Sequence, residues 1–287
     1  MSQPPLTIRD LLAKTTPYLQ SKGALSPRLD AEVLLAETLG TDRLRLYLDM
    51  DRPLTPSELD QYRQFVRRRA AAEPVAYIIG YREFRSLPFA VDRRVLIPRP
   101  ESETVVDLAL QTLGGAPEPA IVDIGAGSGA IIVALGREIP SARLWATDIS
   151  SAALDVAREN ARQLGLGSRV EFRLGDLFAG LEGPFDLVVS NPPYVAEADR
   201  ATLQRDVAEY EPVEALFAGS DGLQVIRRLI AEAPQRLCPG GKLVFEIGQG
   251  QAQAVEALLR QSPHLTFLTI APDLRGIPRA AAAQRRV

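Results

Sequence analysis

Apolar residues recur at two different spacings along the chain, and the change of spacing divides the chain into parts. In residues 1–74 they recur every three or four positions, as from Ala31 to Leu39, and this spacing predicts amphipathic helices. The stretch Thr55-Pro56-Ser57-Glu58 predicts a helix start with Thr55 as N-cap, and Ser26-Pro27 predicts another. We therefore expect a small helical bundle over residues 1–74.

A different pattern occupies residues 75–100. The stretches 81–84 and 89–91, which flank Ser86-Leu87-Pro88, predict a short β-hairpin. Pro88 has no N–H to donate, so its strand is expected at the edge of a sheet. We expect a hairpin linker over residues 75–100 that leads into a second domain over residues 101–287.

Short apolar runs alternate with helical patterns in the second domain. Helices are predicted between these runs, for example over 152–164 and 223–237. Strands that alternate with helices indicate a parallel sheet covered on both faces, which binds ligands at the carboxyl ends of its strands. The runs predicted as buried strands are 120–124, 143–147, 170–174, 185–189, 242–247 and 265–270.

Composition changes this picture mainly by exclusion. The 287 residues contain one cysteine, Cys238, and one histidine, His264, which is isolated in a loop before a predicted strand. No metal site built from Cys and His and no triad with this histidine as base is therefore expected. No apolar run approaches the roughly 18 residues that span a membrane, and no targeting pattern is visible, so we expect a cytoplasmic protein without a membrane partner.

Charge gives a similar exclusion. The net charge of −3 does not indicate a protein that coats nucleic acid. Arg67-Arg68-Arg69 is the densest basic cluster, and two interpretations of it are open. It is either a solvated helix face or a contact with an acidic or RNA-associated partner.

Three glycines follow the first strand of the second domain, in the stretch "IVDIGAGSGAI". Glycine permits a tight turn and a close approach of the backbone to a ligand. The carboxylate of Asp148, which ends the next strand, can accept both hydroxyls of a ribose, and Asp176 or Leu177 after the third strand can border an adenine. The arrangement predicts a nucleotide-like cofactor.

Two cofactors fit this layout, and a turn that binds nothing is the third alternative. Gly125, Gly127 and Ala130 satisfy the dinucleotide pattern G-x-G-x-x-G/A, with Asp148 near the expected distance. Asp123 before the loop, the G-x-G-S-G form and the acidic residues after successive strands resemble the class I S-adenosylmethionine (SAM) methyltransferases. We favour SAM. The loop has no lysine, which argues against a phosphate-binding loop of the ATPase kind.

The fourth strand ends abruptly on Asn191-Pro192-Pro193-Tyr194. The prolines remove two successive N–H donors and stiffen the backbone. The Asn191 side-chain oxygen and the Pro192 carbonyl can accept both hydrogens of one planar NH₂ group, on which Tyr194 can stack. Such a grip directs the nitrogen lone pair at a methyl donor. We therefore assign catalysis to Asn191, Pro192 and Tyr194 and substrate binding to residues 191–194, with a loop that only caps the sheet as the alternative.

Several motifs together resemble one family. They are "VLIPRPESE" (Val95–Glu103), "DIGAGSG", "LWATD", "SNPPY", "EIGQGQ" (Glu246–Gln251) and "DLRGIPR" (Asp273–Arg279). Over nearly the whole chain they are similar to the peptide-chain-release-factor glutamine methyltransferases (PrmC/HemK). The NPPY stretch alone is shared with adenine-N6 DNA methyltransferases and some RNA methyltransferases, whereas the first and last motifs are more selective.

This resemblance implies an α/β fold: a Rossmann-like seven-stranded SAM-methyltransferase sheet, preceded by the helical bundle and the hairpin linker. It implies methyl transfer from SAM to the glutamine amide of a release factor's Gly-Gly-Gln motif, which modulates translation termination. The bundle would dock the release factor, and we expect a monomer with no nucleic-acid substrate. The implied cofactor residues are Asp123, Gly125, Ala126, Gly127, Ser128, Gly129, Asp148, Asp176, Leu177 and Asn191.

The chain departs from the family at two places. Ser102 stands where threonine is usual, and we expect its hydroxyl to cap a helix that starts there. The closing "AAAAQRRV" replaces larger apolar residues by alanine, which makes the last strand a weaker prediction. Arg99 and Glu103 either shape the wall of the pocket or form a salt-bridged helix start.

Three rival functions are open. A nucleic-acid methyltransferase predicts a recognition domain or a basic face, which the sequence does not show. A noncatalytic SAM-binding protein predicts loss of the Asn191–Tyr194 stretch, which is intact. A dinucleotide oxidoreductase predicts a proton donor beside the nicotinamide, and none is evident.

Overall fold

The computed structural model describes residues 6–115 and 117–287, so the first five residues of the expected bundle lie outside the described part. Contacts divide the chain into two compact units. One runs as far as Tyr81 and also includes Gln204–Tyr210, whereas the other comprises Arg82–Leu203 and Glu211–Val287. Each unit is described by itself.

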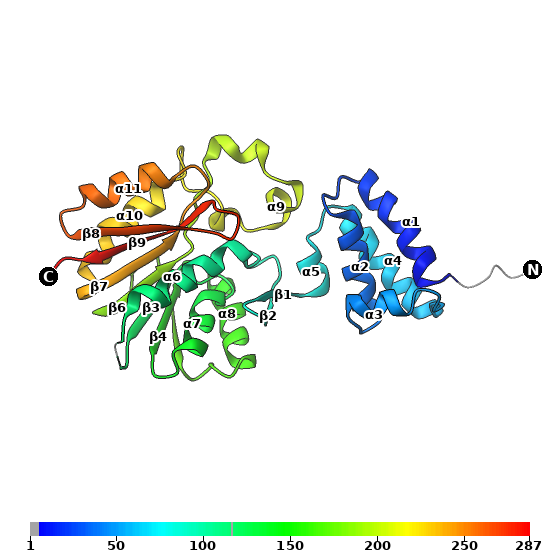
Figure 1. The fold of residues 1–287 in the computed structure, drawn as a ribbon, viewed down its shortest axis with the longest axis horizontal. Coiled ribbons are helices and arrows are strands. Elements are labelled where there is room, and N and C mark those ends of the chain that lie inside the picture. Colours follow the sequence, from blue (N-terminus) through cyan, green and yellow to red (C-terminus); the bar gives the residue numbers. More distant parts are fainter. Residues whose placement is uncertain (1–5, 116) are drawn as a thin grey trace, which may run out of the picture. The chain divides into compact units, whose positions relative to one another are not determined.

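Helices make up the first unit, as predicted (Figure 1). They enclose an apolar core that includes Leu12, Leu34 and Tyr62. The Thr55 capping box is confirmed, because Thr55 Oγ1 accepts the Glu58 N–H at 3.3 Å and Glu58 Oε2 accepts the Thr55 N–H at 2.8 Å. Ser26 makes no such cap. The helices are α1 (Ile8–Ser21), α2 (Pro27–Thr38), α3 (Arg43–Leu48), α4 (Pro56–Ala70), α5 (Val75–Ile79) and α9 (Arg205–Tyr210).

The range expected as a hairpin linker begins with a helix. Residues 75–79 form α5, and Ile78 is buried in the core of the helical unit. The strands β1 (Tyr81–Phe84) and β2 (Leu87–Ala90) then form the predicted hairpin, whose turn residues Arg85 and Ser86 have φ of 48° and 60°. Within the described chain β2 pairs only with β1, which accommodates Pro88.

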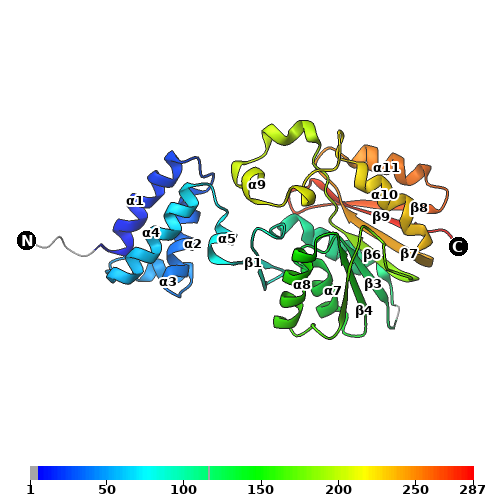
Figure 2. The same cartoon turned by 180° about the vertical axis from the view of Figure 1, so that it is seen from behind.

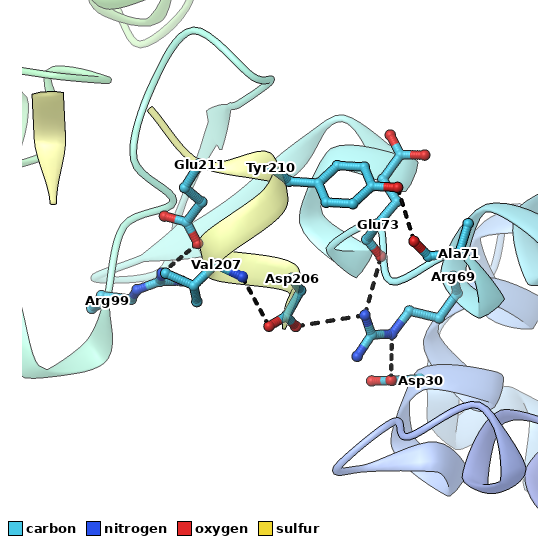
Figure 3. Close-up of polar contacts among 9 residues, drawn as sticks. All are labelled: Asp30, Arg69, Ala71, Glu73, Arg99, Asp206, Val207, Tyr210 and Glu211. Atoms are coloured by element: carbon cyan, nitrogen blue, oxygen red, sulfur yellow. Dashed lines mark hydrogen bonds and ion pairs between the residues drawn. The ribbon is translucent and has the colours of Figure 1, made fainter. Parts of the chain in front are cut away.

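A segment distant in sequence completes the helical unit (Figure 3). Arg69 Nε donates to Asp30 Oδ2 at 2.7 Å, and Arg69 Nη1 lies 3.5 Å from Asp206 Oδ2 in α9. Tyr210 at the end of α9 donates its hydroxyl to the Ala71 carbonyl at 3.0 Å. The Arg69 side chain is only 9% exposed. The interpretation of this arginine as part of a solvated face is therefore wrong.

The second unit contains a seven-stranded sheet, which confirms the predicted Rossmann-like fold. The strand order is β5-β4-β3-β6-β7-β9-β8, and β9 alone runs antiparallel to its neighbours. The order reverses between β3 and β6, which pair in parallel. The strands are β3 (Ala120–Ile124), β4 (Arg143–Asp148), β5 (Val170–Leu174), β6 (Phe185–Ser190), β7 (Leu237–Glu246), β8 (Leu265–Pro272) and β9 (Pro278–Arg285).

Helices cover both faces of this sheet (Figures 1 and 2). The helices α6 (Glu103–Leu113), α7 (Ala130–Glu138) and α8 (Ser151–Gln163) contribute to one apolar core, and α10 (Gln224–Glu232) and α11 (Ala252–Gln261) contribute to the other. Alternate residues of β3 enter opposite cores, Ile121 into the first and Val122 into the second. Short 3₁₀ helices lie at Pro100–Ser102, Glu197–Thr202, Val213–Ala215 and Ala233–Gln235.

One helix is shorter than predicted. The helix expected over 223–237 ends at Glu232, and Leu237 already begins β7. Among the described residues, no helix combines the length and the apolar character needed to cross a membrane.

The four alanines of the closing segment lie inside the sheet. Ala280 to Ala283 are fully buried in β9, between β7 and β8, and alternate between the two cores. The helix α6 packs against β7 and β9, where small side chains leave it room. The alanines that weakened the prediction of a last strand are therefore explained by burial in the middle of three strands.

We expect Arg69→Met to destabilise the helical unit, because it leaves Asp30 and Asp206 without their shared cation. Removing one partner of a largely buried ion pair costs about 3 kcal/mol. Amide hydrogen exchange in α2 and α4 should therefore become about 100-fold faster. Arg67→Met, which removes the same charge from an exposed position of α4, is the matched control. Equal exchange in the two variants would contradict the structural role of Arg69.

Candidate active site

The glycine loop adopts backbone conformations that other residues avoid. Gly125, Gly127 and Gly129 have φ of 76°, 54° and 79°, all in the left-handed region. A Cβ on Gly129 would lie 3.2 Å from the Cβ of Ala157 in α8, so this glycine also permits close packing of the loop on that helix. The loop leads from β3 directly into α7.

The end of β4 holds this loop. The Gly125 and Ala126 amides both donate to the Thr147 carbonyl at 2.9 Å, and the Gly127 amide donates to Asp148 Oδ2 at 2.8 Å. Asp148 Oδ1 accepts the Ser150 N–H at 2.8 Å. Burial raises the pKa of Asp148, and these two amides oppose the shift. Each oxygen keeps a lone pair with which to accept a ligand hydroxyl.

A cavity of about 290 Å³ lies over the loop, at the carboxyl ends of β3, β4 and β6. Ser102, Pro212 and Glu214 line it as well. Asp123, Gly129 and Tyr194 are not among the described residues that line it. The predicted site residues that do line the cavity are Gly125, Ala126, Gly127, Ser128, Asp148, Asp176, Leu177, Asn191, Pro192 and Pro193.

Asp176 and Leu177 form one side of this cavity. Leu177 has φ of 49°, unusual for a residue with a side chain, and its carbonyl accepts the Thr147 hydroxyl at 2.9 Å. The Asp176 carboxylate pairs with Arg228 of α10, with Oδ2 and Nη2 at 2.9 Å. The Arg228 side chain also lines the cavity. The pair places a polar rim beside the apolar Leu177.

Asp123 lies beneath the loop and is 1% exposed. Neither of its carboxylate oxygens has a hydrogen-bond partner among the described residues. Burial raises the pKa of Asp123 to about 7, against a smaller opposing effect of the nearby Ile132 amide. A buried carboxylate without a partner is costly, and it fits a site that receives a cationic ligand.

The Asn191–Tyr194 corner leaves β6 beside the glycine loop. Ile124 and Ser190 are paired in register, and the Ser190 hydroxyl donates to the Ile124 carbonyl at 2.6 Å. The residues that follow these two, Gly125 and Asn191, therefore emerge side by side. Within the described chain no donor binds Asn191 Oδ1 or the Pro192 carbonyl, so two acceptors remain available at the corner.

Glu246 at the end of β7 and Gln251, which follows β7, both bind Tyr194 of the corner. The Tyr194 hydroxyl donates to Glu246 Oε1 at 3.0 Å, and Gln251 Nε2 donates to the Tyr194 carbonyl at 3.0 Å. Burial raises the pKa of the Tyr194 hydroxyl, and the neighbouring Glu246 raises it further. Glu246 and Gln251 had no function assigned from the sequence. An acidic residue that ends a buried strand was the signal for Glu246.

Ser102 has a different role from the one predicted. Its hydroxyl makes no helix cap. Ser102 Oγ is bonded to Glu246 Oε2, and it accepts from Asn191 Nδ2 at 3.1 Å. The expectation of a helix cap is therefore wrong, because the hydroxyl points toward β7 and the corner.

Arg99 and Glu103 do not line the cavity among the described residues. Arg99 pairs with Glu211 (Figure 3). Glu211 also accepts the Ile97 amide at 3.4 Å. Glu103 Oε1 accepts the Arg85 amide at 3.0 Å. Arg99 therefore connects its segment to Glu211, and Glu103 connects α6 to the turn of the hairpin. No cluster of His, Cys, Asp and Glu that could hold a metal ion occurs in the part of the chain that the structure describes.

The chain is similar to known proteins over nearly its whole length. The PrmC N-terminal domain model matches residues 10–80, and the methyltransferase small domain model matches residues 103–209. The release factor glutamine methyltransferase of Rhodopirellula baltica is 40% identical over 98% of this chain and 97% of its own length. That of Bradyrhizobium diazoefficiens is 44% identical over 93% of this chain and 91% of its own length. That of Geobacter sulfurreducens is 43% identical over 97% of this chain and 96% of its own length.

The chain belongs to the release factor glutamine methyltransferase family. The predicted enzyme class, a SAM-dependent protein-glutamine N-methyltransferase, is thereby confirmed. The cofactor of this class is SAM, and the residues present fit it. The glycine loop exposes backbone instead of side chains, Asp148 offers acceptors, and Asp123 offers carboxyl oxygens that have no partner among the described residues.

Solved structures agree on the fold. The hMettl16 catalytic domain in complex with MAT2A 3′UTR hairpin 1 has a TM-score of 0.56 and 20% identity, over 76% of this chain and 79% of that one. A methyltransferase from Pyrococcus furiosus has a TM-score of 0.53 and 18% identity, over 71% of this chain and 91% of its own. At these identities the likeness concerns the fold alone.

We expect the stability of the sheet unit to depend on pH through Asp123. Because the folded-state pKa is raised to about 7, the unfolded chain loses this proton at a lower pH than the folded chain. The contribution of Asp123 to the free energy of unfolding is therefore largest below about pH 4, and it is lost as the pH rises through 7. In between, the free energy of unfolding falls by up to about 1.4 kcal/mol per pH unit.

Asp123→Asn should remove this part of the slope. The single tryptophan, Trp145, lies in β4, so its fluorescence during urea unfolding reports on the sheet unit. Asp199→Asn, at an exposed position, is the control and should keep the wild-type slope. An unchanged slope in Asp123→Asn would count against a buried, protonated Asp123.

Proposed function

We propose that this methyltransferase transfers the methyl group of SAM to the side-chain amide nitrogen of the glutamine in the Gly-Gly-Gln motif of peptide chain release factors, and thereby modulates translation termination. The names of its relatives support release factors as substrates. One observation carries the mechanism: Asn191 Nδ2 is bound to Ser102, which leaves Asn191 Oδ1 for the substrate.

The corner can grip a carboxamide. A primary amide offers two in-plane N–H donors, and Asn191 Oδ1 and the Pro192 carbonyl provide two acceptors on a rigid backbone. The amide lone pair is delocalised perpendicular to the plane, so an amide nitrogen is a poor nucleophile. When both N–H bonds are held in this plane, the lone pair of the amide nitrogen faces the cavity over the glycine loop. Alignment of two reactants supplies about 7–11 kcal/mol in favourable cases.

The residues around the glycine loop are proposed to bind and orient SAM. When bound, SAM supplies a methyl group on a positively charged sulfur. We propose that the Gly125–Gly129 backbone and Asp123 receive the amino-acid end, that Asp148 accepts the ribose hydroxyls, and that Asp176 and Leu177 border the adenine. Support comes from the cavity, which these residues line or underlie.

Tyr194 has a proposed role beside the carboxamide. Its hydroxyl is bonded to Glu246 and its carbonyl to Gln251, so its ring has little freedom. We propose that the ring flanks the substrate amide together with Pro193. The N–CH₃ bond would form as the S–CH₃ bond breaks, and the amide proton, which becomes acidic in this step, would pass to water. Neither a general base nor a metal is therefore assigned.

The remaining assignments concern partners. We propose that the helical bundle of residues 1–74 docks the release factor, and that residues 75–100 link it to the catalytic domain of residues 101–287. A monomer that acts in the cytoplasm on a protein, with no nucleic-acid substrate, agrees with these assignments. The net charge of −3 supports the choice of a protein substrate.

Asn191→Ala should abolish transfer without loss of cofactor binding. It removes one of the two acceptors that orient the amide, and loss of one preorganised hydrogen-bonding group at a reacting centre costs about 10²–10³-fold in kcat. Methyl transfer from radiolabelled SAM to purified release factor measures the rate, and calorimetry measures the Kd for SAM. A release factor with the motif glutamine replaced by glutamate is the substrate control and should take no label. Label on RNA or DNA, with none on release factor, would decide for the nucleic-acid rival.

Asp148→Asn should weaken SAM binding and leave kcat at saturating SAM nearly unchanged. It removes the charge that the ribose hydroxyls meet, and a hydrogen bond to a charged group contributes about 1.5–3 kcal/mol, so the Kd for SAM should rise about 10–100-fold. At saturating SAM, kcat should stay within a few-fold of the wild-type value. A large loss of kcat with unchanged SAM affinity would contradict the assignment.

A further inference from the structure

A buried glutamate joins the two functional side chains of the corner. Glu246 ends β7 and is 1% exposed. Its Oε1 accepts the Tyr194 hydroxyl at 3.0 Å, and its Oε2 is bonded to the Ser102 hydroxyl. Ser102 comes from the 3₁₀ helix Pro100–Ser102, so three distant segments meet at one carboxylate. Glu246 is not among the described residues that line the cavity.

The direction of these hydrogen bonds follows from the chemistry of a carboxylate. An ionised carboxylate carries no proton and can only accept, so both hydroxyls must donate to it. Once Ser102 has donated its single hydrogen, its oxygen can only accept from Asn191. The Asn191 group at 3.1 Å from Ser102 Oγ is therefore Nδ2, and Oδ1 must face the other way.

This direction decides what Asn191 can bind. With Oδ1 outward, Asn191 accepts a hydrogen from a substrate NH₂ group. With the amide flipped, its own NH₂ group would meet the substrate NH₂ group, and no hydrogen bond could form. The chain from Glu246 through Ser102 to Asn191 therefore selects the functional one of two orientations of similar shape.

The electrostatic surroundings of Glu246 are mixed. Burial raises its pKa, and nearby Glu101 acts in the same direction. The two hydroxyl donors and Arg279 stabilise the ionised form and partly oppose this rise, and the pKa stays above the ordinary value of a glutamate. Arg279 is itself paired with Asp273 at 3.2 Å.

We propose that Glu246 is a positioning residue of the methyl transfer: by accepting the Ser102 and Tyr194 hydroxyls it directs the Asn191 amide oxygen toward the substrate carboxamide and holds the Tyr194 ring beside it. This inference rests on the proposed function. It adds an unassigned residue that acts through Ser102 and Tyr194 without contact with the substrate.

Glu246→Gln tests the proposal, because glutamine has the same shape but carries an NH₂ group in place of one oxygen. The NH₂ group of the new glutamine can only donate, so either the Ser102 hydroxyl or the Tyr194 hydroxyl loses the oxygen to which it donates. We expect kcat for release-factor methylation to fall at least tenfold, with the Kd for SAM within twofold of the wild type. The thermal midpoint should not fall, because a buried charge is removed. Glu171→Gln, on the exposed surface of β5, is the matched control.

Two further readouts separate positioning from a general structural role. The side-chain NH₂ hydrogens of Asn191 should exchange slowly with water in the wild type and at least tenfold faster in Glu246→Gln. Ser102→Ala should also lower kcat at least tenfold, and Ser102→Thr, which keeps the hydroxyl, should recover most of that loss.

The outcomes are distinguishable. Wild-type enzyme that leaves the release-factor glutamine unlabelled overturns the proposed function, whatever the variants do. Wild-type enzyme that labels it, with Glu246→Gln within twofold in kcat, overturns the positioning role. Loss of SAM binding and of thermal stability in Glu246→Gln also overturns it, because Glu246 is then a structural residue.

Discussion

The parallel pairing of β3 with β6 determines where both halves of the site lie. Ile124 and Ser190 are partners in register, so the glycine loop and the Asn191–Tyr194 corner leave adjacent strands at the same edge of the sheet. This is the point where the strand order reverses, and the diverging connections open a crevice there. Backbone hydrogen bonds thus bring together the loop that we propose to hold the methyl donor and the corner that we propose to hold the acceptor.

Two buried carboxylates flank this edge, and they serve different purposes. Asp123 has no hydrogen-bond partner among the described residues and burial raises its pKa to about 7, so ionising this carboxyl group costs free energy. Glu246 accepts two hydroxyls and orders the side chains around it. We propose that Asp123 serves the cofactor and that Glu246 orients the corner that would bind the substrate.

Much of this arrangement could be predicted from local sequence. The bounds of β3 and β5 agree with the apolar runs, and the glycine loop and the corner lie where motifs at strand ends should place them. The role of Ser102 could not be predicted, because its hydroxyl meets a carboxylate 144 residues away. The attachment of Gln204–Tyr210 to the helical unit through Arg69 also depends on a contact between distant segments, and no local pattern encodes it.

The most direct test of the account is a crystal structure with S-adenosylhomocysteine and a glutamine-containing release-factor peptide. The account predicts the glutamine amide nitrogen within about 2.7–3.2 Å of both Asn191 Oδ1 and the Pro192 carbonyl oxygen. It also predicts that this nitrogen faces the sulfur of the cofactor product across the cavity. A carboxamide bound elsewhere, or bound with its oxygen toward Asn191, would contradict the account.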